Sequence, residues 1–106
     1  VSAYCASKHA VIGLTRSLSM ELAKKGITVN SICPSYIDTP MTERTIKNIT
    51  KLTNLSTEDA IKELVASNPQ GKLIKPSEVA EGVSWLCKDS SNSINGQSIS
   101  ISGGEI

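Results

Sequence analysis

The pattern of apolar positions divides the chain into alternating helical and extended stretches. Between about residues 3 and 25, apolar side chains recur at steps of three and four, which predicts a long amphipathic helix that ends at Gly26. We expect its apolar face to lie in the core, and that face is formed by Val11, Leu14, Leu18 and Leu22. Residues 27–33 are rich in β-branched side chains and are followed by Pro34, so they predict a strand.

The polar middle of the chain carries two weaker helical patterns. Residues 46–52 place isoleucine and leucine at steps of three, which predicts one or two loose helical turns. Ser56 followed by Asp59 is a capping-box pattern, and the apolar face behind it predicts a short helix up to about Val65.

The last third of the chain predicts one more helix and one more strand. Pro76 suits the first position of a helix whose apolar face runs to Cys87. Residues 97–102 alternate between polar and apolar with period two, which predicts a strand. Because a helical crossover joins the two predicted strands, the strands must be parallel. Such a pair is a poor folding unit by itself, so the chain is interpreted as the back portion of a larger α/β domain with two strands and three main helices.

Composition narrows the possible classes of function. Among the 106 residues, 11 Lys and Arg face 10 Asp and Glu, and this balance favours neither nucleic acid nor an anionic membrane as a partner. Aromatic residues make up only 3%, and no apolar run reaches the roughly 20 residues of a membrane span. Cys5, Cys33 and Cys87 have no metal-ligand or disulfide spacing, so we expect no metal site and three buried thiols in a reducing compartment.

Tyr4 and Lys8 are the sharpest candidates for chemistry. A spacing of four residues puts both side chains on one face of the predicted helix, about one turn apart. An ammonium close to a phenol favours the phenolate, and a tyrosine so placed can act as a general acid or base. The same spacing also occurs by chance in many helices as an exposed pair, so the surrounding residues must decide between the two interpretations.

Residues 4–18, which begin Tyr-Cys-Ala-Ser-Lys, resemble the active-site helix of the short-chain dehydrogenase/reductase family. Further segments resemble, in the family's order, its following strand, cofactor-facing stretch, late helix and last strand: 26–34, 35–41, 68–80 and 94–104. The resemblance covers essentially the whole chain. It implies that residues 1–106 are the C-terminal part of a single NAD(P)-binding Rossmann-fold domain, a doubly wound parallel sheet whose N-terminal dinucleotide-binding half is absent.

The resemblance also implies roles for individual residues. Tyr4 would exchange a proton with the substrate, and Lys8 would hydrogen-bond the nicotinamide ribose and favour the Tyr4 phenolate. The backbone of Ile37 and the side chain of Thr39 would contact the nicotinamide carboxamide. The residues implied to bind NAD or NADP are Tyr4, Lys8, Pro34, Ser35, Ile37 and Thr39.

The implied reaction interconverts a secondary alcohol and a ketone. The likeness is greatest to β-ketoacyl-carrier-protein reductases and to 3-hydroxyacyl-CoA or 3-hydroxybutyrate dehydrogenases, which implies a 3-oxoacyl or 3-hydroxyacyl substrate, a homotetramer or homodimer, and a cytoplasmic location. Arg44, Lys47 and Lys51 would form a basic stripe on a helix in the substrate-lid region. We favour a solvated helix face, and the alternative is a contact with the phosphates of a coenzyme A or carrier-protein thioester.

Two departures and several absences qualify the resemblance. Ser35 stands where the family pattern has Gly, so a positive φ there would strain the backbone. Ser102 stands where an Asp usually precedes Gly103. The Gly-rich turn, the cofactor-selecting residue, and the catalytic Ser and Asn of the family do not lie in these 106 residues. A second hypothesis is therefore a catalytically incompetent fragment that serves as an oligomerisation or interaction module.

Overall fold

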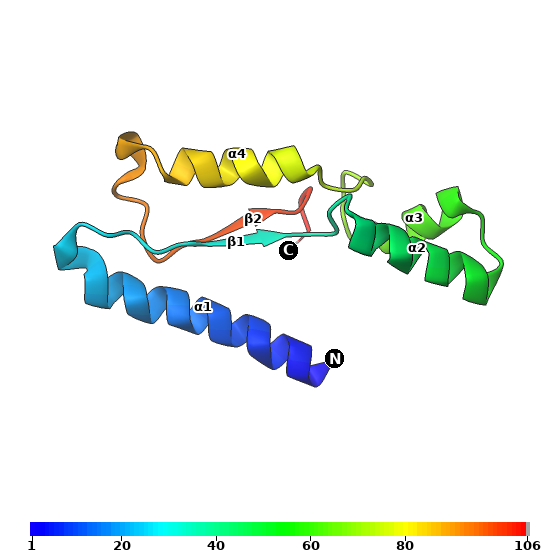
Figure 1. The fold of residues 1–106 in the computed structure, drawn as a ribbon, viewed down its shortest axis with the longest axis horizontal. Coiled ribbons are helices and arrows are strands. Elements are labelled where there is room, and N and C mark those ends of the chain that lie inside the picture. Colours follow the sequence, from blue (N-terminus) through cyan, green and yellow to red (C-terminus); the bar gives the residue numbers. More distant parts are fainter. Residues whose placement is uncertain (106) are drawn as a thin grey trace. The chain divides into compact units, whose positions relative to one another are not determined.

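The computed structural model describes residues 1–105, which form four α-helices, two 3-10 helices and two strands (Figure 1). In chain order these elements are α1 (Ser2–Leu22), η1 (Ala23–Lys25), β1 (Ser31–Pro34), α2 (Pro40–Thr53), α3 (Thr57–Leu64), α4 (Pro76–Leu86), η2 (Asp89–Ser91) and β2 (Ser98–Ile101). The chain divides into two compact units. Unit 1 comprises Val1–Cys33 and Gly82–Ile99, and unit 2 comprises Pro34–Glu81 and the residues from Ser100 onward.

The first predicted helix is confirmed as α1 followed by the 3-10 turn η1. Gly26 ends this segment in the left-handed conformation with φ of 73°, as expected for a glycine that closes a helix. The apolar face of α1 departs in part from the prediction, because only Leu18 and Leu22 of its four residues are half-buried. Val11 and Leu14 are 51% and 58% exposed, whereas the buried positions of the helix are Thr15 and Ser19. The reason is that the side of α1 facing the rest of unit 1 carries the two hydroxyl residues.

The two strands form a parallel sheet, as the crossover argument requires. The backbone N–H of Ser31 donates to the Gln97 carbonyl at 2.9 Å, and that of Ser35 donates to the Ile101 carbonyl at 3.2 Å in the same register. The predicted strand 27–33 begins too early, because β1 starts only at Ser31. Ahead of it, the Val29 carbonyl accepts from the Gly96 N–H at 2.7 Å, but the Val29 N–H donates to a side chain, Asn95 Oδ1, at 2.9 Å, so the regular ladder does not continue there.

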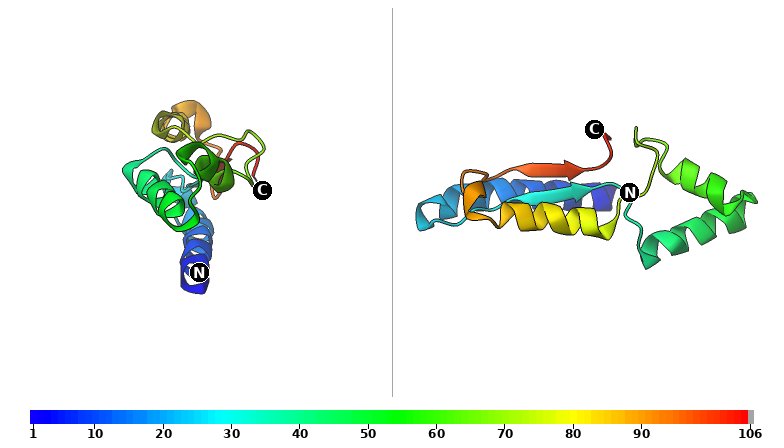
Figure 2. Two further views of the ribbon diagram at one scale, coloured as in Figure 1. Left: turned by 90° about the vertical axis from the view of Figure 1, so that its right-hand side faces the viewer. Right: turned by 90° about the horizontal axis from the view of Figure 1, so that it is seen from above.

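Helices α1 and α4 flank the strands within unit 1. Figures 1 and 2 show α1 on one face of the strand pair and the last turn of α4, which contains Trp85, on the other. The loop that follows α4 is fastened by Ser91, whose Oγ donates to the Trp85 carbonyl at 2.6 Å. This layering is the helix–sheet–helix arrangement expected for an α/β domain.

Helix α2 is longer than the sequence pattern predicts. The weak stripe at 46–52 belongs to a helix of 14 residues, so the described residues 1–105 form four α-helices where the pattern predicts three main ones. Thr39 is its N-cap and accepts from the Thr42 N–H, while Pro40 occupies the first turn. Both are helix-start signals that lie outside the apolar stripe.

Helices α3 and α4 begin where the sequence predicts. The Ser56 hydroxyl accepts from the Asp59 N–H at 3.1 Å, which confirms the predicted cap of α3. Pro76 is the first residue of α4. Helices α2 and α3 then pack against each other as a helical hairpin within unit 2 (Figure 2).

The apolar core of the described residues lies in unit 2. Its buried apolar side chains are Ile46, Ala60, Val65 and Ile74. The prediction of three buried thiols is wrong, because Cys5 and Cys87 are exposed and Cys33 is half-buried. Cys5 and Cys87 occupy outward positions on α1 and just after α4, where no neighbouring element of the described chain covers them. Across residues 1–105, no helix is both long and apolar enough to cross a membrane.

Candidate active site

Tyr4 and Lys8 lie on successive turns of α1 and on the same face. Lys8 Nζ lies 5.2 Å from the centroid of the Tyr4 ring, which places the cation over the ring face. Tyr4 is 65% exposed, and Lys8 is exposed as well. The helix therefore brings a phenol and an ammonium together on a surface that a ligand can reach.

The polar side chains between and beside this pair bond to the helix backbone. Ser7 Oγ donates to the Tyr4 carbonyl at 2.7 Å, and His9 Nδ1 lies 2.8 Å from the Cys5 carbonyl. Both bonds turn these side chains toward the preceding turn of the helix. His9 is exposed.

The segment 34–39 runs from the last residue of β1 to the N-cap of α2, and we call it the β1–α2 loop. Backbone bonds hold its far end. Ile37 forms a parallel bridge with Ile74, and the Asp38 N–H donates to the Ile74 carbonyl at 2.8 Å. The Thr42 hydroxyl donates to the Ile37 carbonyl. Thr39 caps α2, so the two residues predicted to contact a carboxamide are set by the bridge and by the helix start.

Ser35 is held at the near end of the same loop, without the predicted strain. The positive φ values of the described residues fall on glycines and on Asn54, so Ser35 does not need the conformation of a glycine. Its Oγ donates to Glu105 Oε2 at 2.7 Å. The pKa of the Glu105 carboxyl is lowered from its ordinary value, first by this bond and then by a bond from Ser67.

Glu105 is a contact of the site that the sequence pattern misses. It lies 70 residues after Ser35, and no spacing rule connects a residue after β2 with one after β1. The parallel pairing of β1 with β2 is the feature that brings the two chain segments together, because both strands end at the same edge of the sheet. The sequence could have indicated the contact between Ser35 and Glu105 only if the two predicted strands had first been aligned in register.

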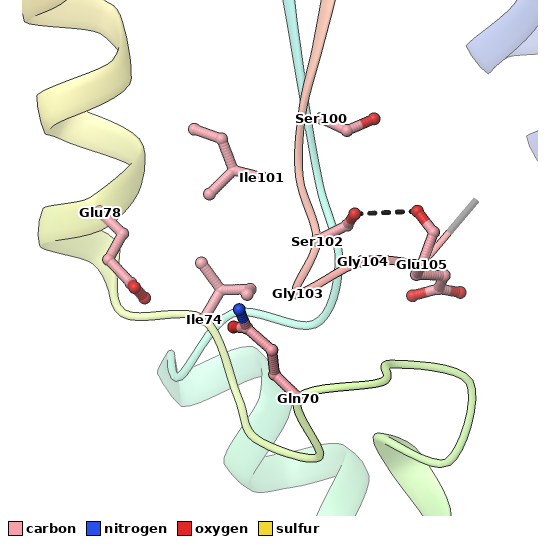
Figure 3. A pocket seen from close by; sticks show the side chains of 9 residues that line it. All are labelled: Gln70, Ile74, Glu78, Ser100, Ile101, Ser102, Gly103, Gly104 and Glu105. Carbon is pink, nitrogen blue, oxygen red and sulfur yellow. Dashed lines mark hydrogen bonds between the residues drawn. The ribbon is translucent and has the colours of Figure 1, made fainter.

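A cavity of about 390 Å³ lies beside this turn in unit 2. Figure 3 shows Glu78 approaching it from α4 and Ser100 and Ile101 from β2, with Gln70 and Ile74 at its lower rim. None of the residues predicted to bind a cofactor lines this cavity. Within residues 1–105, no cluster of three or more His, Cys, Asp or Glu side chains is arranged to hold a metal ion.

The predicted site residues fall into two sets. Tyr4 and Lys8 belong to unit 1, and the β1–α2 loop residues belong to unit 2: Pro34, Ser35, Ile37 and Thr39. Within each set the structure brings the residues together. One set offers a phenol and an ammonium, and the other offers a backbone turn and a hydroxyl.

Residues 1–105 match the family model described as enoyl-(acyl carrier protein) reductase. Because that match spans nearly the whole chain, the chain belongs to the short-chain dehydrogenase/reductase family. The α/β fold of helices around a parallel sheet agrees with this assignment.

Similar proteins of known description extend the comparison. A 3-oxoacyl-[acyl-carrier-protein] reductase of Thermotoga maritima is 41% identical over 101 residues, which is 95% of this chain and 37% of that protein. A D-beta-hydroxybutyrate dehydrogenase of Rhizobium meliloti is 38% identical over 104 residues, 97% of this chain and 40% of that protein. The crystal structure of an actinorhodin polyketide ketoreductase variant with NADPH has a TM-score of 0.86 at 39% identity, and covers 97% of this chain and 40% of that one. The chain thus spans about two fifths of the length of the curated relatives it matches.

Proposed function

We propose that the protein to which this chain belongs is an NAD(P)-dependent oxidoreductase that interconverts a secondary alcohol and a ketone. The observation that carries the proposal is the pairing of Tyr4 with Lys8 on α1, with the ammonium 5.2 Å from the ring centroid and both groups exposed. Residues 1–106 are then the C-terminal part of one Rossmann-fold domain that also holds the cofactor.

Tyr4 acts as the acid and base of the reaction. In the reducing direction its hydroxyl donates a proton to the substrate oxygen, and in the oxidising direction the phenolate removes that proton. The positive charge of Lys8 stabilises the negative charge that forms on Tyr4 when the proton leaves. The exposed surface of both side chains leaves room for substrate and cofactor to approach.

The cofactor is NAD or NADP, and when bound it supplies or accepts the hydride. Lys8 would donate hydrogen bonds to the ribose hydroxyls. Pro34, Ser35 and the Ile37 backbone would line the nicotinamide pocket, with the Thr39 hydroxyl at the carboxamide. The bridge from Ile37 to Ile74 supports this role, because it presets the loop before a ligand arrives.

The proposed substrate is a 3-oxoacyl or 3-hydroxyacyl thioester or acid. Support comes from similarity to a 3-oxoacyl-[acyl-carrier-protein] reductase and a D-beta-hydroxybutyrate dehydrogenase. Arg44, Lys47 and Lys51 lie exposed on α2, at helical spacing and on the side opposite the buried Ile46. This basic stripe would suit the phosphates of a coenzyme A or carrier-protein thioester. The homotetrameric or homodimeric state and the cytoplasmic location implied by the family remain part of the proposal.

The test is a hydride-transfer assay on the full-length protein. Acetoacetyl thioester is supplied with NADH or NADPH, and oxidation of the cofactor is followed by absorbance. Turnover with either cofactor supports the proposal. Charge reversal of Arg44, Lys47 and Lys51 should raise the Michaelis constant for the thioester while leaving that for free acetoacetate unchanged. If neither constant moves, the basic stripe is only a solvated helix face.

The second candidate is a non-catalytic module that keeps an oligomer-forming surface. Val11 and Leu14 on α1 favour it, because two large apolar side chains are more than half exposed on one helix. The same assay separates the candidates. A full-length protein that turns over no substrate with either cofactor, and whose Tyr4→Phe variant is indistinguishable from the parent in oligomeric state, supports the module.

A further inference from the structure

The turn after β2 carries a carboxylate that bridges two loops of unit 2. Ser35 Oγ donates to Glu105 Oε2 at 2.7 Å, and Ser67 Oγ donates to Glu105 Oε1 at 2.8 Å. Each carboxylate oxygen thus has its own hydroxyl partner, and bonds of this kind to an ionised acceptor are stronger than neutral ones. The lowered pKa of Glu105 means that the carboxyl is ionised at neutral pH.

The backbone that carries this carboxylate is itself fastened. Ser102 Oγ donates to the Glu105 carbonyl at 2.9 Å (Figure 3). The Gln70 N–H donates to the Gly103 carbonyl at 3.1 Å. A Cβ at Gly103 would overlap the side chain of Asn68, so the turn lies directly against that buried residue. Glu105 therefore extends from a defined turn toward the two hydroxyls.

Ser35 is where this carboxylate reaches the β1–α2 loop. The loop is bound at Ile37 and Thr39 by the bridge and by the helix start, as described above. At Ser35 the hydroxyl adds a side-chain bond to the backbone bond with Ile101. A glycine at this position, as in the family pattern, could not make that bond, so the contact is a property of this chain.

We propose that Glu105 is a positioning residue for the cofactor-facing β1–α2 loop, acting through Ser35 and steadied by Ser67. The inference rests on the proposed function, because it assumes that the loop meets a nicotinamide cofactor. By holding Ser35, the first residue after β1, Glu105 restricts the conformations of the β1–α2 loop before the cofactor binds. Less conformational freedom is then lost when the cofactor arrives, and affinity rises accordingly.

The experiment uses the full-length protein with Glu105→Gln, Ser35→Gly and the double variant. Glutamine keeps the shape of Glu105 but removes its charge and replaces one acceptor by a donor. Each single change should raise both the dissociation constant and the KM of NAD(P)H by about tenfold, because each removes one charge-assisted hydrogen bond. Nicotinamide fluorescence measures the dissociation constant. The kcat at saturating cofactor should stay within about twofold of the parent.

Two further variants separate positioning from general stability. The double variant should bind no more weakly than either single variant, because both remove the same contact. Ser67→Ala should give a smaller increase, since it leaves the Ser35–Glu105 bond in place. Glu58→Gln, which changes an exposed glutamate of α3 in the same unit, should leave the dissociation constant and KM unchanged.

Three results would overturn the inference. In the first, Glu105→Gln and Ser35→Gly lower the melting temperature or active fraction but leave the dissociation constant of the folded protein unchanged. In the second, the effects of the two changes simply add. In the third, the parent binds neither NADH nor NADPH, which removes the proposed function as well. A parent that binds and turns over the cofactor with unaffected variants overturns the role of Glu105 alone.

Discussion

Different interactions stabilise the interior of each of the two units. In unit 2, the buried side chains include four apolar residues contributed by both helices of the hairpin and the segments after them. In unit 1, the buried residues among those that the structure describes are Thr15, Ser19 and Ser91, all of them polar. Hydrophobic stabilisation scales with the apolar area removed from water, and the buried apolar side chains are in unit 2.

Unit 1 relies instead on side-chain amides that fasten its loops. Asn95 accepts from the Val29 N–H at 2.9 Å and donates to the Ser19 carbonyl at 3.2 Å. Asn30 donates to the Ile94 carbonyl at 3.0 Å and accepts from the Gln97 N–H at 3.0 Å. The lesson is that the proposed acid–base pair belongs to a unit held by directional bonds, whereas the β1–α2 loop belongs to the unit with the core.

The strongest way to test this division is to remove the chemistry from unit 1 alone. In the full-length protein, Tyr4→Phe should lower kcat by about 10²–10⁴-fold, the usual contribution of a positioned acid or base. The melting temperature should stay near that of the parent, because Tyr4 is 65% exposed. Steady-state kinetics with acetoacetyl thioester and thermal unfolding measure the two quantities.

The control for Tyr4→Phe is Cys5→Ala, a change at the next exposed residue of the same helix. It should leave kcat unchanged. Retention of parental kcat in Tyr4→Phe would show that unit 1 does not supply the reacting proton.

The second prediction concerns the core of unit 2. Ile74 is 2% exposed and pairs with Ile37, so Ile74→Ala should lower the free energy of unfolding by about 2–5 kcal/mol. Met20 of α1 is 81% exposed, and Met20→Ala should change the free energy of unfolding by no more than about 0.5 kcal/mol. Urea unfolding of the full-length variants measures both. Equal losses would contradict the contrast between the units, and would mean that the face of α1 carrying Met20 is covered in the full-length protein.

The third prediction compares one turn from each unit. Gly26 and Gly103 both have positive φ, of 73° and 65°. A Cβ at Gly26 meets open space, so Gly26→Ala should cost about 1–2 kcal/mol from its backbone conformation alone. A Cβ at Gly103 collides with Asn68, so Gly103→Ala should lower the free energy of unfolding by about 1–3 kcal/mol more than Gly26→Ala does. Denaturant unfolding that ranks Gly26→Ala as the more harmful change would contradict the close approach in unit 2.

The smallest effect is a dependence of stability on pH. The pKa of Glu105 is lowered in the folded protein by its bonds from Ser35 and Ser67. Its ionised form therefore stabilises the fold above the ordinary glutamate pKa of about 4.3, and this contribution is lost as the pH falls through the lower folded value. The difference in unfolding free energy between parent and Glu105→Gln should thus shrink from about pH 7 to about pH 3. Glu58→Gln should show no such trend, and a constant difference for Glu105→Gln would refute the linkage.

Local signals account for the parts of the fold that the sequence predicts well. The Ser56 cap, Pro76 and the alternating residues before Gly103 each act within a few positions, and each marks an element of the structure. The spacing of Tyr4 and Lys8 is likewise local, and the structure confirms that the two side chains share one helix face.

The errors come from interactions between distant residues. The predicted strand starts too early because the Val29 N–H bonds to a side chain 66 positions away instead of to a backbone carbonyl. The apolar stripe of α1 predicts burial, but periodicity gives only a face and not what covers it, and Leu14 is exposed. Glu105 carries no local signal at all, since its partners Ser35 and Ser67 lie 70 and 38 positions earlier in the chain.

Thr39 has a consequence for any mutational scan of the β1–α2 loop. Its hydroxyl accepts from the Thr42 N–H, and a hydroxyl that accepts can still donate its own proton elsewhere. One oxygen can thus start a helix and meet a ligand at the same moment, so an alanine there would confound weakened binding with a frayed helix. Aspartate, whose oxygen can still accept from the Thr42 N–H but which has no proton to donate when ionised, would separate the two.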